Sequence, residues 1–263
     1  MIIPKTNILA QIVQDKREEV KAISARQVFE FKRIIDEMPA TRDFLQAVSK
    51  PDKISIIAEI KKSSPSLGPI RPDANVRQTA RLYEECGASA ISALTDSKHF
   101  GGSIEDLIEA RNSVKTPILR KDFIIDNKQI YETRACGADA LLLIVAALDD
   151  HELNDFYQTA SGLGLASLVE THSAGEIERA LKINPAIVGI NNRCLKTLNI
   201  DLSVSEKLRG MIPPEVCVIS ESGIKDKTDV LRLATAGINA FLIGTSIISS
   251  DDPGRVLREF TGN

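Results

Sequence analysis

The sequence contains no tryptophan, and aromatic residues make up only 4% of its 263 residues. Proteins that bind single-stranded nucleic acid stack bases on aromatic side chains, and membrane proteins place Trp and Tyr in interfacial belts. No apolar run is long enough to span a membrane, and the opening stretch MIIPKTNILAQIVQDKREEV is too interrupted for the apolar region of a signal peptide. We therefore expect a cytoplasmic protein that binds neither nucleic acid nor a membrane.

Cysteine pairs and a dominant charge are also lacking. The formal net charge of −3 is typical of neither a basic nucleic-acid-binding protein nor a polyacidic tail. Without a C-x-x-C pair, a disulfide framework or a zinc site is not expected, and the thiols should be reduced. The four cysteines lie far apart, at Cys86, Cys136, Cys194 and Cys217.

Three similar stretches indicate a repeated unit: CGASAISALTD at 86–96, CGADALLLIVA at 136–146 and AGINAFLIGTS at 236–246. In each, a glycine follows a helical pattern and precedes a short run of small and branched apolar residues. Glycine in that place is typical of a helix C-terminus, because it adopts positive φ at little cost. The apolar run is typical of a strand that is buried on both faces of a parallel sheet.

The same strand–helix alternation recurs eight times in about 210 residues. It predicts a closed (β/α)8 TIM barrel, which typically needs roughly 250 residues. A doubly wound open sheet is the alternative, but the sequence lacks its G-x-G-x-x-G fingerprint. Strands are expected near 54–60, 88–94, 117–121, 139–145, 165–169, 186–190, 216–220 and 239–243, and helices near 75–86, 104–113, 127–136, 149–162, 173–182, 203–209, 226–236 and 252–260.

Residues 1–50 lie outside this repeat and carry apolar residues at helical spacing. We expect them to form an N-terminal helical extension packed on a barrel of residues 51–263. No linker rich in Pro, Gly or Ser separates the two parts, so a single domain overall is expected.

Polar residues gather where the expected strands end, which is the edge that carries the chemistry of TIM barrel enzymes. One charge at a strand end is usually a solvated loop residue, but here charged or amide residues end most of the strands. Side chains alternate along a strand, so residues two apart share a face. Opposite charges clustered in a partly desolvated mouth can make a lysine a general acid and a glutamate a base. The residues concerned are Glu59, Lys61, Lys121, Phe123, Glu170, Asn191, Arg193 and Glu221.

The last two strands end in glycine combined with hydroxyl residues, in SESGI and IGTS. At these positions in a barrel, backbone N–H groups frequently bind a phosphate, and glycine allows close approach. We therefore expect Ser222, Gly223, Gly244 and Thr245 to contact a phosphate group. The three histidines do not cluster, and none is expected to be catalytic: His99 in a loop, and His151 and His172 at helix starts or in loops.

The residues resemble the indole-3-glycerol phosphate synthase family over nearly the whole chain. IIAEIKKSSPSLGPI is similar to the family signature Glu-x-Lys-x-x-Ser-Pro-Ser after an apolar strand. The remaining matches follow in order: ALTDSKHFGGS, PILRKDFIID, SLVETHS, GINNRCLKT, SESGI and FLIGTSII, with ILAQIVQDKREEV at the start. One departure is Thr245, where the family often has Ser, and the hydroxyl is kept.

The resemblance implies ring closure of 1-(2-carboxyphenylamino)-1-deoxyribulose 5-phosphate, with loss of CO2 and H2O, to indole-3-glycerol phosphate in tryptophan biosynthesis. It implies a phosphorylated small-molecule substrate and no metal or cofactor. Lys121 would protonate or polarise the substrate ketone, and Lys61 would bind the substrate carboxylate or assist the later proton transfer. Glu170 would be the acid/base of the dehydration. The other implied site residues are Glu59, which orients the lysines, Asn191 and Glu221, which hold hydroxyls, Ser64, Arg193, Ser222, Gly223, Gly244 and Thr245, which contact substrate or phosphate, and Phe123 and Leu195, which form an apolar wall.

Two other functions are compatible with a phosphate-binding barrel. A phosphoribosylanthranilate isomerase or thiazole synthase could share the fold, but the signature favours the synthase, and Cys217 lies within an expected strand rather than at its end. A catalytically inactive barrel that serves as a binding module would be expected to lack Lys121 or Glu170, and both are present. We further expect a monomer or weak homo-oligomer, and a substrate-covering loop that begins at the Ser-Pro turn and is shaped by Gly68 and Pro69.

Overall fold

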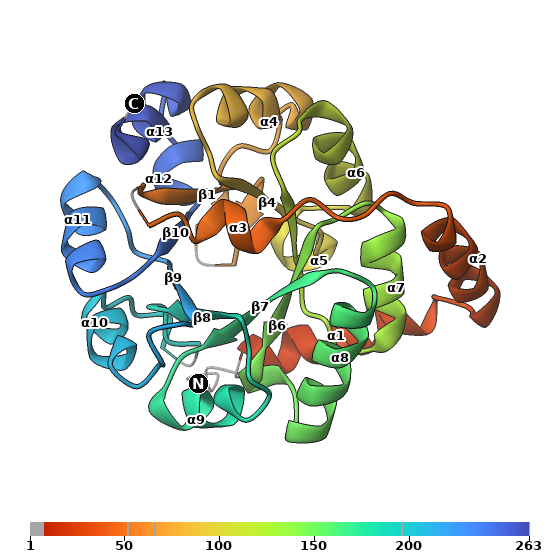
Figure 1. Cartoon of the computed structure of the whole chain (residues 1–263). Helices are drawn as coiled ribbons and strands as arrows, with labels where there is room; N and C mark the ends of the chain where they lie inside the picture. The colour runs from red at the N-terminus through yellow and green to blue at the C-terminus, as the bar shows by residue number, and fades with distance from the viewer. Residues whose placement is uncertain (1–7, 52, 66, 196, 263) are drawn as a thin grey trace, which may run out of the picture.

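Eight parallel strands close into a barrel, as expected for a (β/α)8 TIM barrel (Figure 1). The computed structural model describes the whole chain except residues 1–7, 52, 66, 196 and 263. Neighbouring strands follow one another in sequence around the ring, and β10 pairs with β1. The strands are β1 (Ser55–Ile60), β4 (Ala90–Leu94), β5 (Ile118–Lys121), β6 (Ala140–Ile144), β7 (Ala166–Thr171), β8 (Ile187–Asn191), β9 (Cys217–Glu221) and β10 (Ala240–Ile243).

A helix follows each strand and packs on the outside of the ring. Asn, Ser or Asp side chains accept hydrogen bonds from first-turn N–H groups in all of these helices except α10, which fixes where each begins. None of the helices in the described part of the chain is long and apolar enough to cross a membrane. The outer helices are α4 (Val76–Glu85), α6 (Ile104–Ser113), α7 (Asn127–Ala135), α8 (Asp150–Gly162), α9 (Ala174–Leu181), α10 (Ser203–Arg209), α11 (Lys227–Thr235) and α13 (Pro253–Thr261).

Several short elements at the strand ends were not expected from the sequence. Strands β2 (Ser63–Ser64) and β3 (Gly68–Pro69) form an antiparallel hairpin after β1, where the Ser-Pro turn was noted. The others are α5 (Ser97–Phe100), the 3-10 helix η1 (Val145–Ala147) and α12 (Thr245–Ile248). His99 therefore lies in a helix rather than in the loop that the sequence suggested.

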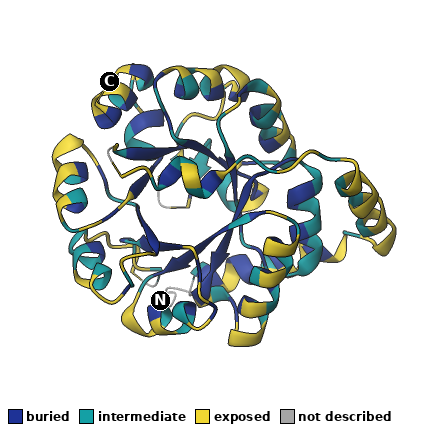
Figure 2. Cartoon of the chain, in the orientation of Figure 1, coloured by how far each residue is buried: buried dark blue, intermediate teal, exposed yellow. Residues whose placement is uncertain are grey.

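Alternation along the strands separates two apolar layers, and the strands are buried over almost their whole length (Figure 2). One layer fills the barrel interior and includes Ile57, Leu119, Leu168, Ile219 and Leu242. The other layer lies between the strands and the surrounding helices and includes Ile56, Ile91, Val188, Val218 and Phe241. The strand sequences are almost continuously apolar because alternate residues pack into the interior layer and into the outer layer.

Three helices precede the barrel. In Figure 1, α2 (Ala25–Asp36) projects at the side of the ring, where it contacts α7. Helix α3 (Phe44–Val48) packs its Phe44 and Val48 side chains on the interior layer at the base of the barrel. Helix α1 (Ile8–Lys21) lies at the opposite end, against the residues that follow the strands. The segment before β1 therefore contacts the barrel from base to mouth.

A buried lysine fixes α1 to the mouth of the barrel. The Lys16 ammonium lies 3.0 Å from Asp96 Oδ2 and 2.9 Å from Asp122 Oδ1, and its side chain is only 1% exposed. Burial lowers the pKa of Lys16, but Asp122, Glu19 and Asp96 outweigh burial and raise it. Asp122 directly follows Lys121, so this ion pair joins α1 to the end of β5.

We expect Lys16→Ala to destabilise the protein more than a surface substitution on the same helix. It would leave Asp96 and Asp122 buried near each other without their shared cation, at a cost of about 3 kcal/mol. Lys21→Ala is the control, because Lys21 forms an ion pair with the exposed Glu18, and its loss should cost less than about 1 kcal/mol. Urea unfolding measures both, and equal losses would show that Lys16 does not anchor α1.

Candidate active site

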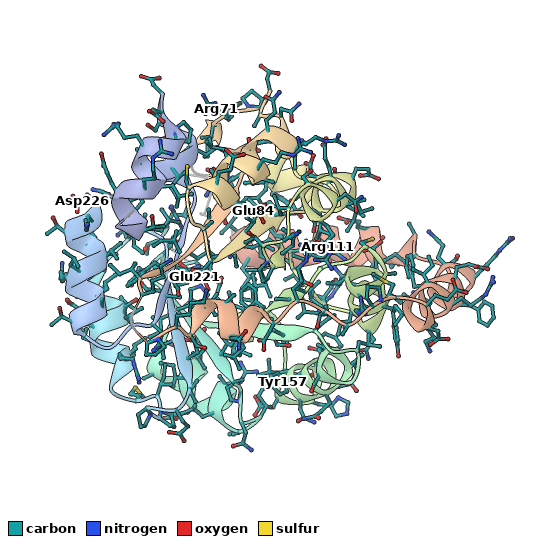
Figure 3. The ribbon with its side chains drawn as sticks, turned by 45° about the horizontal axis from the view of Figure 1, so that its top comes forward. Arg71, Glu84, Arg111, Tyr157, Glu221 and Asp226 are labelled. Atoms are coloured by element: carbon teal, nitrogen blue, oxygen red, sulfur yellow. The ribbon has the colours of Figure 1, made fainter. Side chains whose placement is uncertain are left out.

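The C-terminal ends of the strands surround a cavity of about 410 Å³. Figure 3 shows Glu221 within the ring of strands, whereas Asp226 lies on the outer side. The cavity brings together all of the site residues that the sequence suggested: Glu59, Lys61, Ser64, Lys121, Phe123, Glu170, Asn191, Arg193, Leu195, Glu221, Ser222, Gly223, Gly244 and Thr245.

The inward-facing register of each strand places these side chains. Glu59 lies two residues after Ile57, which faces the barrel interior, and Glu170 lies two residues after Leu168. Lys121 follows Leu119 in the same way. Since side chains alternate along a strand, each polar residue continues the apolar interior face to the mouth. Site residues and core residues thus share the inward face of β1, β5 and β7.

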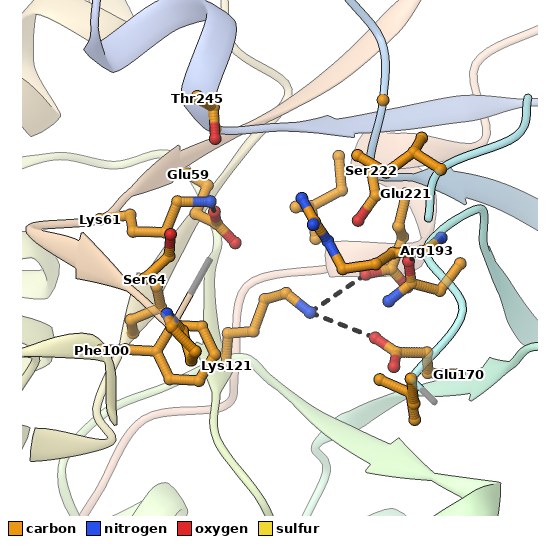
Figure 4. Close-up of a pocket in the computed structure, with 18 of the residues that line it drawn as sticks. Glu59, Lys61, Ser64, Phe100, Lys121, Glu170, Arg193, Glu221, Ser222 and Thr245 are labelled. Carbon is orange, nitrogen blue, oxygen red and sulfur yellow. Dashed lines mark hydrogen bonds and ion pairs between the residues drawn. The ribbon is translucent and has the colours of Figure 1, made fainter. Parts of the chain in front are cut away.

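The Lys121 ammonium lies between two carboxylates, as the dashed lines in Figure 4 mark. Its Nζ is 3.2 Å from Glu170 Oε2 and 3.1 Å from Glu221 Oε2. Burial lowers the pKa of Lys121, but Glu221 and Glu170 outweigh burial and raise it, so the amine is protonated. Burial, together with the charge of Glu170, raises the pKa of Glu221, although Lys121 opposes this shift.

A second ion pair lies across the cavity in Figure 4. Lys61 Nζ is 2.6 Å from Glu59 Oε1, as expected for residues two apart on one face of β1. Lys61 follows the last residue of β1, and its side chain is 14% exposed, close to the 15% of Lys121. The site therefore offers two cations of similar exposure, each held by carboxylate oxygens.

Two glycines leave the space that the carboxylates occupy. A Cβ atom on Gly244 would collide with the Glu59 carboxylate, and one on Gly189 would collide with Glu221 Oε1. Gly189 lies within β8 and has no positive φ, so its backbone does not itself require glycine. The requirement comes from the carboxylate that lies against it, a role that the sequence analysis did not assign to Gly189.

The turn after β9 carries unusual backbone. Ser222 has φ of 67° and Gly223 has φ of 88°, and the first of these is uncommon for a residue with a Cβ atom. The Asn192 side chain supports the turn, since its Nδ2 donates to Ser220 Oγ and to the Ser222 carbonyl at 2.9 and 3.1 Å. Backbone held in such a region costs roughly 1 kcal/mol or more and is typical of functional sites.

Apolar residues cover one side of the cavity, and most of them were not predicted from the sequence. The Phe100 and Phe123 rings lie 6.2 Å apart, centre to centre. Helix α1 adds Ile8, Leu9 and Ile12, and the loop after β8 adds Leu198 and Ile200 beside Leu195. A planar aromatic group would fit between such side chains.

His172 is the other residue that the sequence analysis left out of the site. It follows β7, and its Nε2 lies 3.3 Å from Glu170 Oε1. Its position two residues after Glu170 was the signal that could have placed it, because this spacing continues the inward-facing register. Among the described residues, no group of three or more His, Cys, Asp or Glu side chains is arranged to hold a metal ion.

Comparison with known proteins agrees with this geometry. The profile of the indole-3-glycerol phosphate synthase family matches residues 9–260. The indole-3-glycerol phosphate synthase of Albidiferax ferrireducens is 45% identical over 258 residues, covering 97% of this chain and 98% of that protein. The Legionella pneumophila (strain Paris) protein of the same name is 42% identical over 255 residues, covering 96% and 98%.

Solved structures of lower identity share the fold. A 3-hexulose-6-phosphate synthase superposes with a TM-score of 0.63 at 14% identity, over 80% of this chain and 99% of that one. A thiamine phosphate pyrophosphorylase from Pyrococcus furiosus gives 0.60 at 15% identity, over 80% and 94%. These likenesses concern the barrel alone. The profile match and the relatives that align over nearly their full length show that the chain belongs to the indole-3-glycerol phosphate synthase family.

Proposed function

We propose that this protein catalyses the reaction for which its relatives are named. It closes the pyrrole ring of 1-(2-carboxyphenylamino)-1-deoxyribulose 5-phosphate and releases CO2, H2O and indole-3-glycerol phosphate. The observation that carries this proposal is the Lys121 ammonium held between Glu170 and Glu221 in the cavity of a family member. The enzyme is then a carboxy-lyase of tryptophan biosynthesis.

Ring closure needs an acid, and Lys121 is suited to that role. Attack of the aromatic carbon on the ketone carbon forms a C–C bond and leaves negative charge on the ketone oxygen. A proton moves from the Lys121 ammonium to that oxygen, and the carboxylate on the attacking carbon then leaves as CO2. Lys61, paired with Glu59, can bind the substrate carboxylate or assist the later proton transfer.

Dehydration needs a group that takes and returns a proton, and Glu170 is placed to do so on the far side of Lys121. Glu59 orients Lys61, and Asn191 and Glu221 hold substrate hydroxyls. Glu221 Oε1 is buried and has no hydrogen-bond partner among the described residues, which leaves it available to a hydroxyl donor. Such an unpaired buried acceptor is costly unless a ligand satisfies it.

The phosphate end of the substrate requires polar surroundings, and its aromatic end requires apolar ones. The hydroxyl and backbone groups of Ser64, Ser222, Gly223, Gly244 and Thr245 suit the phosphate, with Arg193 nearby. Phe123 and Leu195, joined by Phe100, form the wall for the aromatic ring. The hairpin of β2 and β3 would cover the bound substrate.

Other functions fit less well. An isomerase built on this barrel would be expected to use a cysteine at a strand end, and Cys217 is buried within β9. A binding module without activity would not need a protonated lysine between two buried carboxylates, since that arrangement costs desolvation energy. We also propose that residues 1–50 and 51–263 form one domain, and that the protein is a monomer or weak homo-oligomer in the cytoplasm.

Turnover of the carboxyphenylamino-deoxyribulose phosphate, followed by the fluorescence of the indole product, tests the function directly. Wild type should be active in buffer that contains a metal chelator. Lys121→Ala and Glu170→Ala should each lower kcat by about 10²- to 10⁴-fold, because each removes a group that transfers a proton. Far-UV circular dichroism checks folding, and a folded wild type without turnover would refute the proposed reaction.

Gly189→Ala should lower activity although residue 189 touches no substrate in this scheme. The added methyl group occupies the place of Glu221 Oε1, so Glu221 must move away from Lys121. We expect kcat to fall by at least about tenfold, since small displacements of catalytic groups are costly. Gly175→Ala in α9 is the matched control, because a Cβ there meets nothing within 4 Å. Equal activity of both variants would show that Gly189 does not seat Glu221.

A further inference from the structure

His172 lies directly beside Glu170, and the reaction proposed above does not use it. Its Nε2 is buried and lies 3.3 Å from Glu170 Oε1. The contact is mainly electrostatic, because the two groups are close but do not form a well-aligned hydrogen bond. It stabilises Glu170 when the imidazole ring is protonated.

Glu176 holds the opposite side of the ring. Its Oε2 lies 3.1 Å from His172 Nδ1 and accepts the backbone N–H of His172 at 2.8 Å. Its Oε1 accepts a hydrogen bond from Ser173 Oγ at 3.2 Å. Burial lowers the pKa of His172, but the carboxylates of Glu170 and Glu176 outweigh burial and raise it to about 10. The ring is thus fixed in orientation and protonated at neutral pH.

His172 makes the surroundings of the two carboxylates unequal. Glu170 and Glu221 both contact Lys121, but within the described part of the chain only Glu170 contacts a second cation. Burial raises the pKa of Glu170, yet Lys121 and His172 outweigh it and lower the value. Burial also raises the pKa of Glu221, and there Lys121 does not compensate for burial together with the charge of Glu170.

The remaining neighbours do not supply such a charge. From β8, Asn191 offers Glu170 a neutral hydrogen bond, and from α9, Glu176 faces the histidine. From β1, Glu59 acts on the pair only through the charge of Lys121. The inequality between Glu170 and Glu221 therefore comes chiefly from His172, and the neutral Asn191 hydrogen bond adds to it.

We propose that His172, clamped by Glu176, is a positioning residue that keeps Glu170 ionised while Lys121 gives its proton to the substrate. This inference rests on the function proposed above. In that step an N–H bond of Lys121 breaks, an O–H bond forms on the former ketone oxygen, and the amine becomes neutral. Glu170 and Glu221 then lose their shared cation, and His172 is the positive group still in contact with Glu170.

The positive charge of His172 also affects the dehydration step that follows. Two buried carboxylates without a cation would share a proton, as like charges at short distance do. A protonated Glu170 could not take a proton during dehydration. The imidazolium directs the shared proton to Glu221 instead, so the base stays available.

His172→Gln tests the charge while keeping a polar side chain of similar length. Loss of the cation raises the pKa of Glu170, so the acidic limb of the kcat–pH profile should move to higher pH by about 1 unit, with KM little changed. A residue that only supported the fold would lower kcat equally at every pH. His151→Gln, which changes an exposed histidine in α8, is the control and should leave the profile unmoved.

A second measurement does not depend on turnover. The carboxyl ¹³C signal of Glu170, assigned by its loss in Glu170→Gln, should titrate at higher pH in His172→Gln than in wild type. If His172→Gln does not fold, Glu176→Gln removes the clamp and should shift the same signal in the same direction by less. An unmoved Glu170 signal overturns the inference, whereas a moved signal in a protein without turnover overturns the proposed reaction alone.

Discussion

One buried ammonium group shared by two carboxylates determines how the mouth of this barrel is built. Lys121 is held by Glu170 and Glu221 at the strand ends, where both carboxyl groups are buried and the lysine side chain is 15% exposed. Taking charged groups out of water is expensive, and the attraction among them repays the cost only when their geometry is well fixed. Gly189 and Gly244 provide the space for the carboxylates, and His172 supplies the positive charge that the arrangement otherwise lacks.

The two-residue period of a β-strand explains why so much of the site could be predicted. Charges that follow apolar runs are visible in the sequence, and alternation assigns them to the interior face. The structure confirms that Glu59 and Lys61 meet on one face and that the ends of all these strands converge on one cavity. The regular spacing of strands and helices likewise identified the barrel, because parallel strands joined by helices have few ways to close.

Other features depend on contacts between segments that are distant in sequence. Lys16 resembles any lysine of a charged helix until Asp96 and Asp122 are seen beside it. Phe100 lines the cavity because α5 turns the chain after β4. A helix of only four residues is too short to show a periodic pattern in the sequence. His172 was set aside because the three histidines are scattered along the chain. Its relevance follows from its place two residues after Glu170, not from other histidines.

At the end of β5, the residues that form structural ion pairs and the residue that lies in the site point to opposite sides of the strand. Arg120 and Asp122 form an ion pair, and Arg120 also donates to Glu132 and Thr133 of α7, away from the barrel interior. Lys121, between them in sequence, faces the interior and the two glutamates. The outer ion pairs therefore fix the end of β5 without contacting the Lys121 ammonium. Because Lys16 joins Asp122 from α1, the N-terminal segment is tied to that outer network, and its docking holds the strand end from which the central lysine extends.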